Sequence, residues 1–310
     1  MWGIAPQKDK GVAMTPRFIN PYTDFGFKKL FGEEANKDLL IDFLNAVLPP
    51  ENQVTDLTFR NPEQLPNNIV DRKAIFDIAC VGEHNELFTV EMQKAKQRYF
   101  KDRALFYTSF PIQSQAKKGD WNFELNPVFL VAILDFEYDE EKERRLLHSV
   151  VTLKDQENNV FFDKLKMIFL QMPLFQLSES ELVTRQDKWL FFLKNLESFD
   201  DIPSIFHEPI FEKAFDAAEY YKYSPKLQEA YQNDLKVYRD NRNAFDTARF
   251  EGLTEGEAKG RAEGKAEGLA EGKAEGLAEA ARKLKQFGVN DETIAKATGL
   301  SIDEIKQLPE

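Results

Sequence analysis

The chain contains little cysteine, little histidine and no long apolar run, and each shortage argues against one kind of site or location. Its single cysteine, Cys80, lies in an apolar segment, so we interpret it as a core residue and not as a nucleophile or disulfide partner. The three histidines lack the spacing of a zinc site. The longest apolar run, residues 128–134, is far too short to cross a bilayer, and the first 14 residues lack the apolar region of a signal peptide. We therefore expect a cytoplasmic protein with no membrane partner.

The chain also lacks an excess of basic charge. Its 41 Lys and Arg residues stand against 53 Asp and Glu residues, which gives a net charge of −12. Adhesion to nucleic acid through overall charge is thereby excluded, so any contact with DNA must use a local basic patch. The length of 310 residues suffices for one sizeable domain with appendages.

The most informative pattern lies in residues 71–97, where two apolar runs flank a polar turn and each run contains one acid, Asp77 or Glu91. If the runs form a β-hairpin centred near His84, the two acids lie directly opposite each other and on the same face. Their Cβ atoms would then be about 4.5–5.5 Å apart, where like charges repel. A divalent cation between them would relieve that repulsion. Gln93 shares the face with Glu91.

A solvated surface hairpin is the structural alternative for this segment. Against it, the apolar residues Ile75, Ala79 and Leu87 share the acidic face by strand alternation. We therefore expect Asp77 and Glu91 to be partly covered, and covered carboxylates need partners.

The flanking segments predict an α/β core. Apolar spacing over 39–47 predicts a helix ended by two prolines, and a strand is expected at 54–60. Residues 98–118 are helical in pattern, with Pro111 expected to kink or interrupt the helix. The apolar segment 127–136 suits a strand buried on both faces, and further strands are expected near 147–153 and 165–171. The helix before the buried strand permits a parallel crossover, so we expect a three-layer α/β sandwich with a mixed β-sheet.

Composition divides the chain into five parts: a disordered N-terminus at 1–14, with Met14 as an alternative start; the core at 15–175; a helical, aromatic-rich region packed on the core at 176–250; a Gly/Glu repeat at 251–280; and a small helix-turn-helix-like unit at 281–310. In the last unit Asp291 and Ser301 are expected to cap two helices, with Gly299 at the turn between them. Ile294, Ala295, Leu300 and Ile305 would form its small core. Packing and DNA contact are both open roles for this unit.

In the Gly/Glu repeat a glycine recurs every fourth residue from Gly252 to Gly276. Each interior glycine costs a helix about 1 kcal/mol relative to alanine. The repeat is therefore either a flexible acidic linker or a helix whose glycine stripe lets a partner helix approach closely. Ala, Glu and Lys at the other positions favour the helix, and with it a homo-oligomer formed through the tail.

Several ordered segments together resemble one bacterial family. They are YTDFGFKKLFG, FDIAC, TVEMQ and RALFYTSFPIQSQAKKG, followed by the buried strand and the glycine-glutamate tail, and they span roughly residues 16–300. This pattern resembles the PD-(D/E)XK nuclease family transposases, which are related to the recombination-promoting nucleases. The resemblance implies a restriction-endonuclease-like core and Mg²⁺-dependent hydrolysis of DNA phosphodiesters, with Mn²⁺ expected to substitute.

By this resemblance Asp77 and Glu91 are catalytic metal ligands. Gln93 stands where the wider superfamily usually has lysine, so it can orient water but contributes no charge. Lys94 or Lys96 would then supply the charge. Strand alternation puts Lys94 on the opposite face, which favours Lys96 as the catalytic lysine.

The resemblance also assigns roles outside the hairpin. Asp24 is expected either as a third metal ligand or as the N-cap of the helix that follows it, and Asp71 is a lower-ranked alternative acid. Lys28 and Lys29 would hold a phosphate or simply be solvated. DNA-backbone contacts are expected from four cations downstream: Arg98, Arg103, Lys117 and Lys118. Tyr107 and Gln113 match family positions, and we interpret them as structural.

The sequence thus predicts a metal-dependent DNA endonuclease that promotes recombination or acts with mobile elements. The alternative is a non-catalytic DNA-binding or self-assembling module that retains the nuclease fold. A regulatory role in which the tail mediates self-association is compatible with either.

Overall fold

The computed structural model describes residues 16–60, 77–96, 98–117, 119–138 and 145–309. The proposed N-terminal segment 1–14, Asp71 and Lys118 therefore lie outside the described residues. The chain forms two compact units, Met1–Tyr238 and Arg239–Glu310, which we describe separately. No helix in the described ranges is both long enough and apolar enough to traverse a bilayer.

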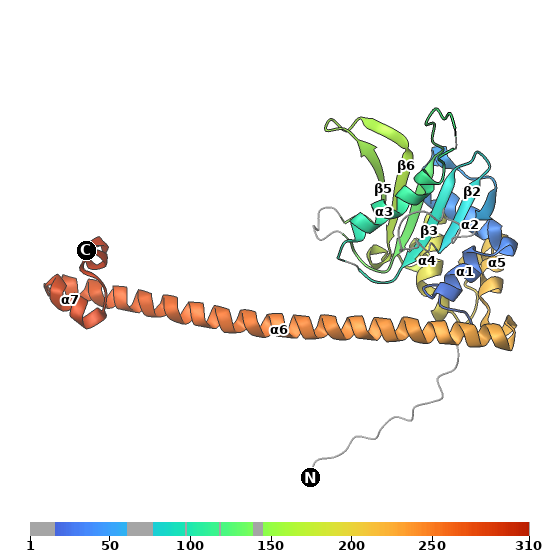
Figure 1. Cartoon of the computed structure of the whole chain (residues 1–310). Coiled ribbons are helices and arrows are strands. Elements are labelled where there is room, and N and C mark those ends of the chain that lie inside the picture. The colour runs from blue at the N-terminus through green and yellow to red at the C-terminus, as the bar shows by residue number, and fades with distance from the viewer. Residues whose placement is uncertain (1–15, 61–76, 97, 118, 139–144, 310) are drawn as a thin grey trace, which may run out of the picture. The chain divides into compact units, whose positions relative to one another are not determined.

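The first unit is built on a mixed sheet of six strands (Figure 1), with β1 at Leu57–Arg60, β2 at Ile78–Gly82, β3 at Leu87–Gln93, β4 at Val128–Leu134, β5 at His148–Lys154 and β6 at Val160–Gln171. The strand order is β1-β2-β3-β4-β6-β5, in which β4 pairs in parallel with β3 and β6, and the remaining pairs are antiparallel. All seven residues of β4 are buried, as its unbroken apolar sequence predicted. The predicted parallel crossover from β3 to β4 is also confirmed.

Helices cover both faces of this sheet, so the unit is a three-layer α/β sandwich (Figure 1). One face packs on α1 (Asp24–Phe31), α2 (Lys37–Val47), α4 (Arg185–Asn195) and α5 (Pro209–Ala218). The other face packs on α3 (Phe100–Gln113). Pro111 lies inside α3 without ending it, so of the two expected effects, a kink or an interruption, the interruption is wrong. Short 3₁₀ helices occur at Glu34–Asn36, Pro50–Asn52, Met172–Leu174, Glu179–Glu181, Leu196–Ser198, Ser204–Phe206 and Tyr220–Lys222.

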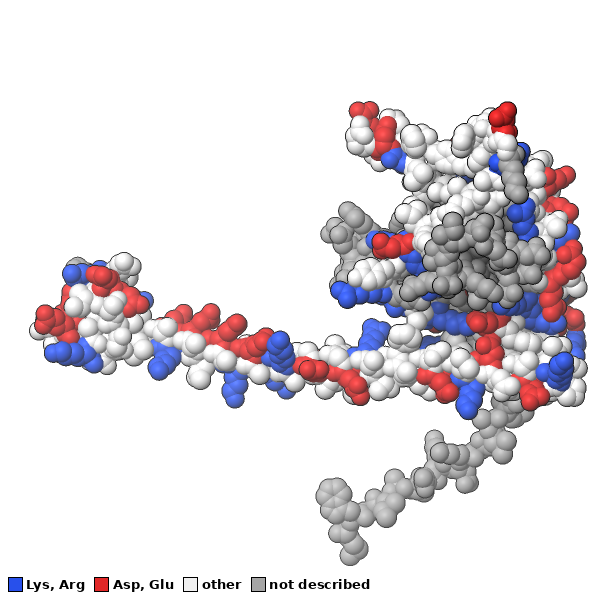
Figure 2. Space-filling view, viewed as in Figure 1, with Lys and Arg blue, Asp and Glu red and all other residues white. Residues whose placement is uncertain are grey.

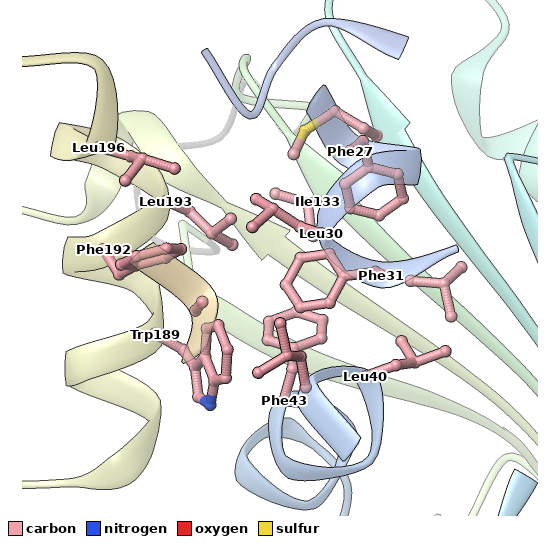
Figure 3. Close-up of a cluster of buried hydrophobic side chains, with 14 of the residues drawn as sticks. Phe27, Leu30, Phe31, Leu40, Phe43, Ile133, Trp189, Phe192, Leu193 and Leu196 are labelled. Atoms are coloured by element: carbon pink, nitrogen blue, oxygen red, sulfur yellow. The ribbon is translucent and has the colours of Figure 1, made fainter. Parts of the chain in front are cut away.

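The larger core lies between the sheet and the helices of the first face (Figure 3). Trp189 of α4 is fully buried at its centre, 5.6 Å from the Phe31 ring and 5.9 Å from the Phe43 ring. These aromatic side chains bury large apolar areas and prefer such tilted or edge-on contacts. The indole N–H of Trp189 donates to Asp42 at 2.6 Å, so its one polar group is satisfied.

The start of α6 (Pro225–Gln286) belongs to this unit, and the remainder of the helix belongs to the second. The Gly/Glu repeat, for which the sequence left a linker or a helix open, lies entirely within α6. Charged side chains of both signs follow its length (Figure 2). Apart from the adjoining backbone of the helix itself, no atom of the described residues lies within 4 Å of a Cβ added at any of its seven repeat glycines, Gly252 to Gly276.

The second unit ends in α7 (Asp291–Thr298) and α8 (Ile302–Gln307). The four residues expected in its core, Ile294, Ala295, Leu300 and Ile305, do pack together, with Ala281 and Leu284 of α6. Ser301 caps α8 in a capping box with Glu304, as predicted. The cap of α7 is Asn290, whose side chain accepts from the Thr293 amide, so the prediction of Asp291 is wrong by one residue.

Candidate active site

The β2–β3 hairpin has the register that the sequence predicted. Ile78 pairs with Val90 and Cys80 with Phe88, which centres the hairpin on His84. Continuing this register by one residue places Asp77 opposite Glu91. Asn85 adopts a left-handed conformation (φ 65°) in the turn, which an asparagine tolerates better than most residues. The hairpin therefore sets the two acids side by side at the start of β2.

Strand alternation directs the two acids toward the face of the sheet that α3 covers. Glu91 is in register with Ala132 of β4, and Ala132 packs in the cluster formed by α3 residues Phe100 and Ala104. The neighbouring residues Val90 and Met92 point into the larger core on the opposite face. Glu91 therefore lies beside the small side chain of Ala132, on the α3 side of the sheet.

Glu91 is a buried acid with one unused oxygen. Its side chain is 4% exposed, and Oε2 accepts from Gln93 Nε2 at 2.8 Å. Oε1 is buried and has no hydrogen-bond partner among the described residues. Burial, and then the charge of Asp77, raise the pKa of Glu91 to about 7, while Gln93 and the charge of Arg103 act in the opposite direction. A buried carboxylate oxygen without a donor is costly, and a bound cation would satisfy it.

Asp77 is half-buried beside it and is held by the backbone. Its Oδ2 accepts from the Met92 amide at 2.8 Å. Burial raises the pKa of Asp77, the Met92 hydrogen bond lowers it, and the charge of Asp24 raises it further. The cations Lys28 and Lys94 lower the pKa of Asp77. Both acids therefore resist ionisation in the absence of a further positive charge.

Asp24 lies near this pair but does not cap its helix. Thr23 is the N-cap of α1, since its hydroxyl accepts from the Gly26 amide at 2.9 Å, so the alternative expected for Asp24 is wrong. The Asp24 carboxylate instead forms an ion pair with Lys94. Among the described residues, no group of three or more His, Cys, Asp or Glu side chains is arranged to hold a metal, so Asp24 does not complete a three-ligand set with Asp77 and Glu91 here.

Lys94 lies on the face of the sheet opposite α3, as strand alternation predicted, because α1 and Tyr238 both pack on that face. Its charge nevertheless lowers the pKa of Asp77. The Lys94 ammonium reaches Asp24 and lies 6.0 Å from the centroid of the Tyr238 ring. Lys96, which the sequence favoured as the catalytic lysine, is exposed beyond the end of the strand.

Helix α3 brings Arg103 and Tyr107 to the acids. The charge of Arg103 lowers the pKa of Glu91. Burial raises the pKa of Tyr107, and the charges of Arg103, Glu91 and Asp77 all act on it. The sequence placed Arg103 on the DNA backbone and Tyr107 in a structural role, so this pairing was missed. Arg103 and Tyr107 are four residues apart and so share one face of their helix. Because this helix connects β3 to β4, that spacing is the sequence signal that could have placed both side chains near Glu91.

The other side chains expected at the site differ in their distance from the acids, and among them the charge of Lys28 acts on Asp77. Lys29 is paired with Glu33 at 2.9 Å, and Lys28 is exposed on the neighbouring position of α1. Arg98 is exposed, with its guanidinium 5.5 Å from the Tyr99 ring centroid. Gln113 and Lys117 are exposed at and after the end of α3.

A mixed sheet between helical layers, with two acids paired on one hairpin, is the arrangement of a restriction-endonuclease-like protein. The chain belongs to the PD-(D/E)XK nuclease family transposases, whose family model matches residues 21–248. Asp77, Glu91 and Gln93 all lie inside the matched region. A comparison with curated proteins found no match, and a comparison with solved structures also found none.

Proposed function

We propose that this protein is a Mg²⁺-dependent DNA endonuclease that hydrolyses phosphodiester bonds at Asp77 and Glu91. The observation that carries the proposal is the buried Glu91 Oε1, which has no hydrogen-bond donor among the described residues. The charge of Asp77 nearby makes a bound cation still more favourable. Nucleases of this kind generally use divalent metals. Mg²⁺ is typically bound through one or two carboxylates together with waters and a substrate phosphate, so two acids suffice.

The side chains would divide the work as follows. Asp77 and Glu91 would hold the cation, which when bound lowers the pKa of a water and offsets charge on the phosphate. Gln93 would orient the attacking water through its amide. We place the positive charge that offsets the developing phosphate charge on Lys94, which already acts on Asp77, and keep Lys96 as the alternative. Arg103 is a second cation on the α3 side of the site.

The finer points of the function are part of the same proposal. Mn²⁺ is expected to replace Mg²⁺, because both accept carboxylate and water ligands. DNA-backbone contacts are proposed for the exposed cations on and beside α1 and α3, and self-association is proposed for the Gly/Glu segment of α6. A bacterial, cytoplasmic setting and a role in recombination or with mobile elements complete the proposal.

Plasmid nicking in Mg²⁺ tests the proposal directly. Asp77→Asn and Glu91→Gln should each abolish nicking, because each removes one negative ligand while keeping the side-chain shape. Asp163→Asn is the matched control, since Asp163 is an exposed acid on β6, and it should nick like the unaltered chain. Calorimetric titration with Mn²⁺ gives a second readout, in which both site variants should lose binding. Equal nicking by the Asp77 variant and the control would show that the site is wrongly assigned, and a DNA-binding module without activity would then replace the enzyme.

A further inference from the structure

A cleft of about 380 Å³ opens beside Asp77. It lies between α1 and the β1–β2 edge of the sheet, and Asp77 forms part of its wall. The residues that matter for its chemistry are Phe25, Lys28, Lys29, Phe59, Arg60 and Asp77. The proposed function gives backbone contacts to exposed cations on α1, among them Lys28, but assigns no ligand to the cleft itself.

Two cations of the cleft have no salt-bridge partner among the described residues. Lys29 is compensated, since its ammonium lies 2.9 Å from both carboxylate oxygens of Glu33. Lys28 and Arg60 form no salt bridge with any other residue that the structure describes. The charge of Lys28 also acts on Asp77, which shows that it is close to the acids. A group that carries negative charge and lies next to Asp77 would therefore be attracted by two available cations.

The walls of the cleft are aromatic and firmly held. Phe25 is fixed at the start of α1, where its amide donates to Asp234 at 2.7 Å and its ring packs 5.7 Å from the rings of Tyr223 and Tyr231. Phe59 lies in β1 in register with Cys80. Aromatic side chains of this kind are surfaces on which nucleic-acid bases stack, and stacking does not depend on the identity of the base.

The size of the cleft restricts what can enter it. Ligand clefts for small molecules typically measure about 300–1,000 Å³, so this one lies at the lower end of that range. A DNA duplex, whose major groove alone is about 12 Å wide, cannot enter it. A single nucleotide can, provided that its base is not paired.

We propose that this cleft binds one unpaired nucleotide of the DNA strand that is cleaved at Asp77 and Glu91. Lys28 and Arg60 contact its phosphates, and Phe25 and Phe59 contact its base. This inference rests on the proposed function and adds a substrate class to it: the enzyme acts on single-stranded, frayed or mismatched DNA in preference to a fully paired duplex. Extracting a paired base costs a few kcal/mol, whereas an already unpaired base enters at little cost.

Binding of fluorescein-labelled 12-mers, measured by anisotropy in EDTA, tests this preference without requiring catalysis. The unaltered chain should bind the single strand more tightly than the duplex. Arg60→Ala and Lys28→Ala should each weaken single-strand binding about tenfold and change duplex binding less than twofold. Each variant should also reduce the slope of log Kd against log salt concentration by about 0.7, as expected for the loss of one phosphate contact.

Two further variants separate charge from aromatic contact. Phe59→Leu keeps the apolar volume but removes the ring, and it should weaken single-strand binding at least about fivefold without changing the salt slope. Lys154→Ala is the matched control, because Lys154 is exposed on β5 at the opposite edge of the sheet, and it should bind like the unaltered chain. Far-ultraviolet circular dichroism confirms that each variant is folded.

The possible results distinguish this inference from the proposed function. If Arg60→Ala, Lys28→Ala and Phe59→Leu all bind the single strand as the control does, or weaken single-strand and duplex binding equally, the cleft does not bind an unpaired nucleotide. That result would leave the nicking test of Asp77 and Glu91 unaffected. If instead the cleft variants behave as expected while Asp77→Asn nicks normally, the binding site stands and the proposed catalytic site falls.

Discussion

The metal-free protein should carry a pH-dependent instability that arises from one buried acid. Burial and the charge of Asp77 raise the pKa of Glu91 from its ordinary value of 4.5 to about 7. An acid with a higher pKa in the folded chain than in the unfolded chain stabilises the fold below the unfolded pKa. That stabilisation is lost as the pH rises through the folded pKa. For Glu91 the loss occurs between about pH 4.5 and pH 7.

The size of the loss follows from the two pKa values. At about 1.4 kcal/mol per pH unit, the difference between 4.5 and about 7 corresponds to about 3 kcal/mol of unfolding free energy. The near-complete burial of Glu91 means that solvent screening does little to reduce this figure. Acids in ion pairs, such as Glu208, have lowered pKa values. They therefore make the free energy of unfolding fall as the pH is lowered, which is opposite to the effect of Glu91. The contribution of Glu91 must therefore be measured against a variant.

Urea unfolding in EDTA at pH 5 and pH 8, followed by tryptophan fluorescence, to which the buried Trp189 contributes, measures this contribution. Glu91→Gln should be about 3 kcal/mol more stable than the unaltered chain at pH 8 and nearly equal to it at pH 5. Glu157→Gln, which alters an exposed acid in the β5–β6 turn, should follow the unaltered chain at both pH values. Mg²⁺ at pH 8 should stabilise the unaltered chain and leave Glu91→Gln unchanged. If Glu91→Gln shows the same pH dependence as the unaltered chain, the buried-acid reasoning is refuted.

Three further predictions follow from other parts of the chain. Lys94→Met should reduce plasmid nicking about 100-fold while Lys96→Met reduces it little, and the reverse order would return the catalytic charge to Lys96. Gly264→Ala and Gly268→Ala should each stabilise the α6 helix by about 1 kcal/mol in thermal unfolding followed by circular dichroism, because nothing lies within 4 Å of the added Cβ; no gain would contradict that geometry. A chain ending at Arg249 should be monomeric by size-exclusion chromatography with light scattering, whereas the full chain should be oligomeric. Equal oligomeric states would remove the assembly role of the tail.

The hairpin could be predicted because several local signals agreed. Alternation of apolar and polar residues set the faces of both strands, and the polar turn set the register, so the positions of Asp77 and Glu91 followed. The buried strand β4 was equally clear, since both of its faces are apolar. These elements depend on residues close together in the chain, which is the information that a single sequence contains.

The parts of the site that were missed depend on side chains at the ends of elements or on contacts between elements. Thr23 and Asp24 are both suitable caps, and composition does not show at which residue the helix begins. Lys94 lies on the face that alternation predicted, but its pairing with Asp24, which brings its charge near Asp77, depends on how α1 packs on the sheet. Arg103 faces Glu91 only because α3 packs on one particular face of the sheet. In each case tertiary packing determines the position of a side chain that the local sequence pattern does not fix.

The nuclease unit extends into α6 because the site depends on it. Asp234 of α6 accepts from the Phe25 amide, one of the backbone donors that the start of a helix leaves without an intrahelical partner. Tyr231 accepts from the Asn20 amide at 2.8 Å, just before the same helix. These contacts fix the first turn of α1, and with it the Asp24–Lys94 pair beside Asp77. A domain boundary near residue 250, where the sequence changes character, therefore keeps the turns of α6 that support the site. A boundary at the start of α6 would remove Tyr231 and Asp234, which position the site although they lie more than 200 residues from it along the chain.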